Sequence, residues 1–175
     1  MNKKKYTIAQ ILPALNTGGV ERGVIEISKA LSDNGFNSIV ISSGGHMVPQ
    51  LRRSGTKHYE INVHSKNPLK WPAVRRRLKA VLLSVGADIV HVRSRAPAWI
   101  ALPLTRAMGI HSISTIHSKF VPKNFVKRIY NQKMLSADGI IAISDYVKSV
   151  ITSHYSEAIS EKAIQVIHRG VDLDG

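Results

Sequence analysis

The chain has 175 residues, enough for one domain that buries a core of its own, and 43% of them are hydrophobic. It contains no cysteine, which excludes a disulfide framework and a thiolate metal site. Its formal net charge at pH 7 is +14, and no apolar run approaches the ~20 residues that a membrane-spanning helix needs.

Short apolar runs alternate with amphipathic stretches along the whole chain. The runs at 89–92, 112–116 and 139–143 are continuous, which is typical of strands buried on both faces. Strands are expected at 6–12, 38–42, 58–63, 89–92, 112–116, 139–143 and 163–167, and helices at 20–34, 72–85, 97–108, 124–135 and 145–155. This alternation predicts an α/β fold, a Rossmann-like parallel sheet with helices on both faces.

The first expected strand is followed directly by Asn-Thr-Gly-Gly-Val-Glu-Arg at 16–22, where a helix begins. Gly18 and Gly19 let the backbone approach a ligand closely. The first-turn N–H groups and the helix dipole favour an anion such as phosphate, and Glu21 and Arg22 lie in that turn. The segment has neither the G-x-G-x-x-G spacing of dinucleotide-binding folds nor the Gly-Lys-Ser/Thr of a P-loop. An ordinary strand–helix turn is the alternative interpretation.

Four later stretches add short motifs. They are Ala-Asp-Ile-Val-His at 87–91, Ser-Thr-Ile-His at 114–117, Ala-Asp-Gly-Ile-Ile-Ala-Ile-Ser at 137–144 and Val-Ile-His-Arg-Gly-Val-Asp at 166–172. Together with segment 16–22 they resemble, in order, the motifs of the family 4 glycosyltransferases, retaining enzymes whose GT-B architecture has two Rossmann-like halves. Arg169 stands where that family usually has Asn. The resemblance covers the whole chain and depends on five weak motifs in the right order.

The resemblance implies that residues 1–175 form the N-terminal, acceptor-side half of such an enzyme, with the donor-binding C-terminal domain absent from this chain. It implies a hexosyltransferase-type reaction that moves a sugar from a nucleotide-sugar to a glycan or lipid-linked acceptor, with retention at the anomeric carbon. A role in cell-envelope, lipopolysaccharide-like glycan synthesis is expected, and the isolated half should be inactive. No cofactor and no metal are expected, because the nucleotide-sugar is a co-substrate and the histidines lack metal-ligand spacing.

Ligands of such sheets bind beyond the carboxyl ends of the strands, where polar residues gather in this sequence. The resemblance implies that His117 is the catalytic residue, hydrogen-bonded to the transferred sugar or the acceptor; a histidine satisfied by backbone groups is the alternative. The other expected site residues are Gly18, Gly19, Glu21 and Arg22 against the donor, Arg93, Ser94, Arg95 and Lys119 for an anionic acceptor, and Arg169, Gly170 and Asp172 at the hinge between the halves. Guanidinium groups suit a phosphorylated acceptor because they bind phosphate bidentately; surface charge is the alternative.

The excess positive charge lies in the middle of the chain, where residues 52–133 hold 17 Lys and Arg against two acids. Such a concentration indicates an anionic partner. Two expected basic helices also carry aromatic residues, a composition typical of helices that lie on an anionic membrane. The expected membrane surface consists of Trp71, Arg75, Arg76, Arg77, Lys79, Lys123, Lys127 and Arg128. The protein is therefore expected in the cytoplasm, peripheral at the inner face of the cytoplasmic membrane; basic faces that meet only solvent are the alternative.

Two other functions fit parts of the sequence. A dinucleotide-binding oxidoreductase domain would share the fold, but the second strand ends in Ser-Ser-Gly at 42–44, where a ribose-binding acid is expected. A nucleic-acid-binding domain is suggested only by the charge, and without a recognised binding module nucleic acid is not an expected partner. Residues 1–5 and the apolar run after them imitate a secretory signal, but Gln10 and Pro13 interrupt that run, so none is expected.

Overall fold

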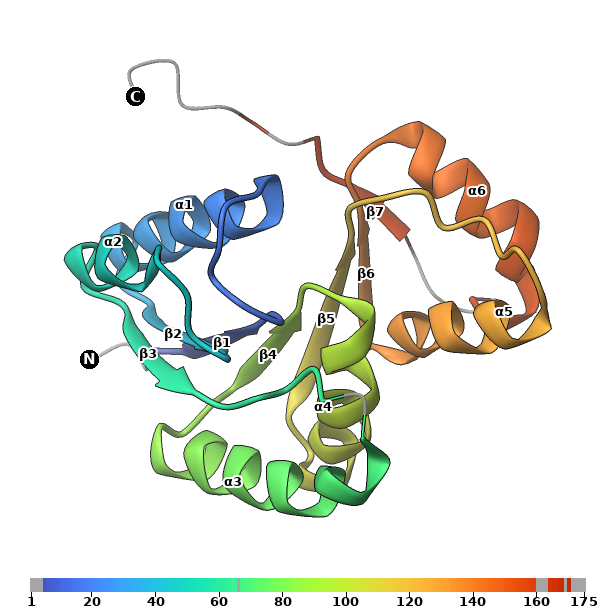
Figure 1. The fold of residues 1–175 in the computed structure, drawn as a ribbon. Helices are drawn as coiled ribbons and strands as arrows, with labels where there is room; N and C mark the ends of the chain where they lie inside the picture. The colour runs from blue at the N-terminus through green and yellow to red at the C-terminus, as the bar shows by residue number, and fades with distance from the viewer. Residues whose placement is uncertain (1–4, 66, 160–163, 169, 171–175) are drawn as a thin grey trace.

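Seven parallel strands form the centre of the fold in the computed structural model, which describes residues 5–65, 67–159, 164–168 and 170 (Figure 1). The strands are β1 (Thr7–Ile11), β2 (Asn37–Ser42), β3 (Lys57–Glu60), β4 (Ile89–Val92), β5 (His111–Ile116), β6 (Gly139–Ala142) and β7 (Ile164–Val166). Their order across the sheet is β3-β2-β1-β4-β5-β6-β7, and every neighbouring pair is parallel. The seven expected strands and the parallel sheet are therefore confirmed, with small shifts at the strand ends.

Helices cover both faces of the sheet (Figure 1). They are α1 (Gly19–Asp33), α2 (Val48–Arg53), α3 (Trp71–Ser84), α4 (Arg95–Met108), α5 (Phe125–Gln132) and α6 (Asp145–Tyr155), with 3-10 turns η1 (Pro68–Lys70), η2 (Lys133–Ser136) and η3 (Ser156–Ala158). On one face, Val24 of α1 and Leu51 of α2 belong to a small core over β1 and β2. On the other, Leu78 of α3, Ile100 of α4 and Ile151 of α6 join the larger core.

The order of the strands reverses between β1 and β4. β1 pairs with β2 on one side and β4 on the other, and Ile8 lies in register with both Ser38 and Ile89. The chain leaves β1 for α1 on one face and leaves β4 for α4 on the other, so a crevice forms beyond the carboxyl ends of these two strands. This topology brings the expected site residues of different strands to one edge of the sheet.

The aspartates of the two Ala-Asp motifs, Asp88 and Asp138, hydrogen-bond to neighbouring strands at the amino edge of the sheet, opposite the crevice. The Asp88 carboxylate accepts a 2.8 Å hydrogen bond from the Thr7 backbone N–H. The Asp138 carboxylate accepts hydrogen bonds of 2.8 and 2.9 Å from the backbone N–H and the hydroxyl of Ser112. Because both aspartates satisfy backbone N–H groups where a strand begins, they stabilise the sheet rather than contribute to a site.

Two elements differ from the expectation. The expected helix over 124–135 is α-helical only from Phe125 to Gln132, and a 3-10 turn begins at Lys133. Asn124 caps this shorter helix, since its side-chain oxygen accepts a 2.8 Å hydrogen bond from the Lys127 N–H. Helix α2 was not foreseeable in this way, because six residues contain too few periodic positions to be told from a loop.

Candidate functional site at the carboxyl edge of the sheet

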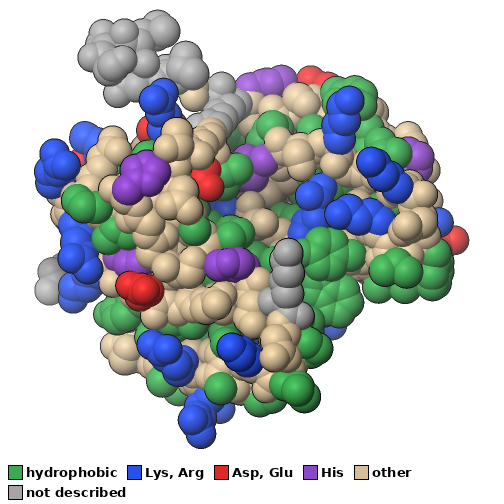
Figure 2. All heavy atoms as spheres, viewed as in Figure 1, with side chains coloured by type: hydrophobic (Ala, Val, Ile, Leu, Met, Phe, Trp, Pro, Cys, Tyr) green, Lys and Arg blue, Asp and Glu red, His purple; other side chains and the backbone are tan. Residues whose placement is uncertain are grey.

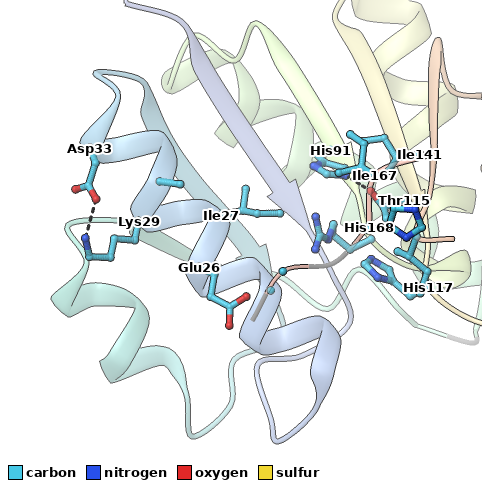
Figure 3. A pocket seen from close by; sticks show the side chains of 15 residues that line it. Glu26, Ile27, Lys29, Asp33, His91, Thr115, His117, Ile141, Ile167 and His168 are labelled. Atoms are coloured by element: carbon cyan, nitrogen blue, oxygen red, sulfur yellow. Dashed lines mark hydrogen bonds and ion pairs between the residues drawn. The ribbon is translucent and has the colours of Figure 1, made fainter. Parts of the chain in front are cut away.

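A cavity of about 580 Å³ lies between α1 and the strands β4, β5 and β6 and reaches their carboxyl ends (Figure 3). Its lining residues are Gly23, Glu26, Ile27, Lys29, Ala30 and Asp33 from α1, and His91, Arg93, Thr115, His117, Ile141, Ile143, Ile167, His168 and Gly170 from the strands and the segments that follow them. In Figure 3, Ile27 points from α1 towards the strands. Isoleucines of α1, β6 and the segments after β6 and β7 therefore give the cavity apolar surface, and polar side chains of β4, β5 and the residues after them line another part of it.

The buried side of α1 does not include all of its large hydrophobic residues. Val24 and Ser28 are buried against the sheet, whereas Ile27 lines the cavity. On the buried side of α1, Nε2 of the buried Gln10 of β1 donates a 3.2 Å hydrogen bond to the Val24 carbonyl and a 2.9 Å hydrogen bond to the Ser28 hydroxyl. A polar residue of the first strand thus contacts the buried side of α1, and Ile27 lies on the side that faces the cavity.

His117 directly follows β5 and lines the cavity (Figure 3). Thr115, two residues earlier, lies on the same face of the strand because side chains alternate along a strand. A neutral imidazole at this position can both donate and accept a hydrogen bond, which suits a sugar hydroxyl. The structure therefore places the expected catalytic residue where a ligand could reach it.

His91 lines the cavity but was not among the expected site residues. It is buried on β4, and its Nε2 lies 2.7 Å from the Thr115 hydroxyl of β5. Burial lowers the pKa of His91 well below the ordinary value of 6.5, and the neighbouring charges of Arg93 and His117 lower it further. The signal was available: His91 and Arg93 are two residues apart at the end of one strand, so they must share a face.

The two expected acceptor arginines have different surroundings. Arg93 is only 5% exposed and lines the cavity. Arg95 begins α4, and its Nη2 donates to the Ser118 hydroxyl at 3.3 Å and to the Lys119 carbonyl at 3.0 Å. Its guanidinium also lies 5.2 Å from the centroid of the Phe120 ring, and burial lowers its pKa. Arg95 therefore holds the loop after β5, and Arg93 is the arginine that faces the cavity.

The other two expected acceptor residues do not line the cavity. Ser94 is partly buried and precedes the first residue of α4 as its N-cap. Lys119 is exposed, and its backbone carbonyl accepts the hydrogen bond from Arg95. The structure thus brings Arg93 together with His117 but separates both from Ser94 and Lys119.

The glycine turn borders the cavity. Gly18 is the N-cap of α1, and a Cβ at this position would collide with the Glu21 carboxylate, which is folded back over it. Gly19, Glu21 and Arg22 lie in the first turn, whereas the lining of the cavity begins at Gly23. The turn therefore places the N-terminus of α1 beside the carboxyl edge of the sheet, with the Glu21 carboxylate over Gly18.

A second glycine segment supports this turn. The Leu15 N–H donates a 2.7 Å hydrogen bond to the Gly44 carbonyl, and the Thr17 hydroxyl lies 3.0 Å from Nε2 of His46. Gly45 has a φ of +141°, and a Cβ there would collide with the backbone carbonyl of Leu15. The loop after β2 thus packs closely on the loop that carries the expected donor residues.

Of the expected hinge residues, Gly170 is exposed and lines the cavity. Arg169 and Asp172 lie outside the described residues. His168 also lines the cavity, and its Nε2 lies 3.6 Å from the Asp145 carboxylate. In the part of the chain that the structure describes, no group of three or more His, Asp or Glu side chains could hold a metal ion. The absence of a metal and a cofactor stays an expectation.

The expected membrane residues fall into two groups. Five of them lie on α3, where Arg75 donates a 3.0 Å hydrogen bond to the Trp99 carbonyl and Trp71 donates one of 2.9 Å to the Ser65 carbonyl. The remaining three, Lys123, Lys127 and Arg128, are exposed at and before α5. No helix within the described residues is both long and apolar enough to cross a membrane.

Comparison with known proteins places this chain in a family. A family model described as Glycosyltransferase Family 4 matches residues 17–174. A glycosyltransferase from Rickettsia africae ESF-5 is 37% identical, with a TM-score of 0.82 over 98% of this chain and 45% of that one. A comparison with curated proteins finds no match.

Two more distant structures share the fold. Alr3699/HepE of Anabaena, solved in complex with UDP and glucose, is 16% identical, with a TM-score of 0.73 over 94% of this chain and 45% of that one. Sucrose-phosphate synthase of Thermosynechococcus elongatus is 15% identical, with a TM-score of 0.74 over 97% and 49%. This chain thus spans about half the length of each of these proteins. It belongs to glycosyltransferase family 4 and has the Rossmann-like fold of the N-terminal half of a GT-B enzyme.

Proposed function

We propose that this chain is the acceptor-side half of a retaining, hexosyltransferase-type glycosyltransferase. It would transfer a sugar from a nucleotide-sugar to a glycan or lipid-linked acceptor in cell-envelope glycan synthesis. Family membership supports glycosyl transfer, and the complexes of Anabaena Alr3699/HepE with UDP, glucose and UDP-glucose support a nucleotide-sugar as donor. The observation that carries the proposal is the placement of His117 and Arg93 on one wall of the cavity that reaches the carboxyl edge.

Each described group has a role in this proposal. His117 hydrogen-bonds a sugar hydroxyl near the reacting carbon and orients it in the transition state. Arg93 binds an anionic group of the acceptor, such as a phosphate, because its fixed fork of donors matches phosphate geometry. The N-terminus of α1 at Gly18 and Gly19 faces the donor diphosphate, where backbone N–H groups and the helix dipole favour negative charge.

The second, donor-binding half would complete the site. It would contribute the nucleotide-binding wall and approach the carboxyl edge beside Gly170, where the expected hinge lies. The isolated half is then expected to fold without transferring sugar, because half of the cleft is missing. Turnover by the purified 175-residue chain alone would contradict this division of labour.

The test uses a two-half enzyme, that is, this chain followed by a matching donor-binding half. Nucleotide-sugars are screened with glycan and polyprenyl-phosphate acceptors, and the anomeric configuration of the product is read by NMR. We expect transfer with the configuration of the donor retained. An inverted product would refute the retaining mechanism, and the absence of transfer from every nucleotide-sugar would refute the activity.

The proposed location is the cytoplasmic face of the membrane, with the protein bound peripherally. The basic face of α3, with Arg76, Arg77 and Lys79 exposed, supports an attraction to anionic lipid. Each cation that reaches such a surface contributes about 1 kcal/mol. A lipid-linked acceptor would then be met at the membrane from which it projects.

A further inference from the structure

Helix α5 turns an apolar edge towards solvent. Phe125, Val126 and Ile129 are 75%, 74% and 43% exposed, and Asn131 is the buried residue of this helix. The helix is anchored, because Nδ2 of Asn131 donates a 3.0 Å hydrogen bond to the Tyr155 hydroxyl of α6. Figure 2 shows hydrophobic side chains gathered over α5 at the right edge of the molecule. A fixed helix that exposes large apolar side chains together is typical of a contact surface.

Basic side chains flank this edge. Lys123, Lys127 and Arg128 are exposed. From residue 89 to residue 137 the sequence holds eight Lys and Arg and no Asp or Glu. Glu157 lines a small groove with Arg128 and is an acidic neighbour from the other side. The segment therefore has no counter-charge of its own, which favours a negatively charged partner.

A row of aromatic rings connects α5 with α4 and α3. Trp99 stacks on Tyr130 and lies tilted against Trp71, with 6.3 Å between ring centroids in both pairs. Cations lie over these rings, 5.3 to 5.8 Å from a centroid: Arg75, Lys127 and Lys133. Trp and Tyr are enriched at membrane–water interfaces, where an apolar ring body and a polar group are both satisfied.

The positive charges around Trp99, those of Arg75, Arg106 and Lys133, also repel one another. Burial lowers the pKa of Lys133, and the nearby charges of Arg106 and Arg75 lower it further. Arg75 is held in this position by its 3.0 Å hydrogen bond to the Trp99 carbonyl. An anion bound beside Trp99 would relieve this repulsion, because an opposite charge stabilises each charged form.

From these observations we infer that α3, α4 and α5 form a docking surface for an anionic lipid bilayer, with Phe125 and Val126 inserted between the headgroups. The row Trp71–Trp99–Tyr130 lies at headgroup level, and its cations contact lipid phosphates. This inference rests on the membrane contact of the proposed function, and it adds the exposed apolar residues Phe125, Val126 and Ile129 of α5 to the basic residues expected there. Exposed Val126 and Ile129 distinguish a bilayer from nucleic acid, since aliphatic side chains offer a phosphate backbone no favourable contact.

The test uses a built-in reporter, because Trp71 and Trp99 are the two tryptophans of the sequence and both belong to the aromatic row. The chain is mixed with phosphatidylcholine vesicles with or without phosphatidylglycerol, and with vesicles that carry brominated lipid. With phosphatidylglycerol present, we expect tryptophan emission to shift to shorter wavelength and to be quenched by bromine. With phosphatidylcholine alone, we expect neither change.

The variants separate insertion from general charge. Phe125→Ser with Val126→Ser should weaken vesicle binding about tenfold or more, as expected for the loss of two inserted side chains. Changing Lys123, Lys127 and Arg128 to Gln should have a similar effect. The matched controls lie away from this surface: Phe36→Ser for the apolar change, and Arg52, Arg53 and Lys57 changed to Gln for the basic one. Both controls should bind as the unchanged chain does, and melting temperatures establish that every variant folds.

Three results would overturn the inference. They are unquenched tryptophans in the bound state, equal binding by the α5 variants and the controls, and self-association that Phe125→Ser abolishes, which would assign the edge to contacts between copies. A test of transfer keeps the two proposals apart. In the two-half enzyme, the α5 variants should transfer sugar to a water-soluble acceptor at the unchanged rate, whether or not vesicles bind.

Discussion

Nε2 of His91 lies 2.7 Å from the hydroxyl of Thr115, and this pair joins β4 to β5 in the wall of the cavity. The pair is buried, and the Thr115 hydroxyl is a hydrogen-bond partner of the imidazole. Burial favours the neutral imidazole, and the positive charge of Arg93 favours it further. The imidazole of His91, in the wall of the cavity, is therefore uncharged at neutral pH.

The first prediction is a pH dependence of stability caused by His91. Its pKa in the folded state is below the unfolded value of about 6.5, so the unfolded chain binds the extra proton as the pH falls. The contribution of neutral His91 to the free energy of unfolding is fully present above pH ~6.5. It is lost as the pH falls from there towards the folded pKa, by at most about 1.4 kcal/mol per pH unit. Urea unfolding of the wild type and His91→Gln at several pH values measures the difference. The wild type should lose stability relative to the variant in acid, whereas His154→Gln, on an exposed part of α6, should follow the wild type. Parallel curves for the wild type and His91→Gln would contradict the assignment.

The second prediction concerns His117 and is tested in the two-half enzyme. His117→Ala should lower turnover by ~10²-fold or more, as expected when a positioned polar group is lost from the transition state. The melting temperature should change little, because this side chain lies at the cavity rather than in the core. His111→Ala is the matched control, since His111 is exposed at the other end of the same strand. If His117→Ala lowers stability but leaves turnover per folded molecule normal, the residue belongs to the scaffold.

The third prediction separates the two arginines. Arg93→Gln should raise the KM for an anionic acceptor about 10- to 100-fold, the effect of losing one charged hydrogen bond, and should leave a neutral acceptor almost unaffected. Arg95→Gln should instead lower the free energy of unfolding by about 1–3 kcal/mol, because it removes the hydrogen bonds to Ser118 and Lys119. Acceptor titrations and urea unfolding on the same preparations measure both effects. Exchanged phenotypes would show that Arg95, not Arg93, contacts the acceptor.

The fourth prediction concerns Gly45. Gly45→Ala should cost more than about 2 kcal/mol of stability, because it combines an unfavourable φ with a collision against the Leu15 carbonyl. Gly55→Ala is the control: its φ of +78° is also unfavourable, but open space surrounds its Cβ, so about 1 kcal/mol is expected. Chemical denaturation measures both. Equal costs would mean that the contact between the two loops contributes nothing.

Much of the candidate site could be predicted because residues that follow different strands of a parallel sheet lie near one another at one edge. Every strand in such a sheet ends at the same edge, so motifs that end apolar runs must converge there. Alternation then puts Arg93 with His91, and His117 with Thr115, on common faces. Arg95 could not be assigned in this way, because it lies in the first turn of α4, where the strand period no longer applies.

The sequence by itself determined the element order, the parallel sheet and the edge at which His117 and Arg93 meet, since these follow from local periodicity and the geometry of strands. Only the tertiary structure decided which side of each helix is covered. Gln10 is buried beneath α1, where its side chain bonds the Val24 carbonyl and the Ser28 hydroxyl, and Ile27 of the same helix lines the cavity. Likewise, the structure shows that α5 buries the polar Asn131 and exposes the apolar Phe125. The physical reason is that burial depends on partners distant in the chain, which local patterns do not encode.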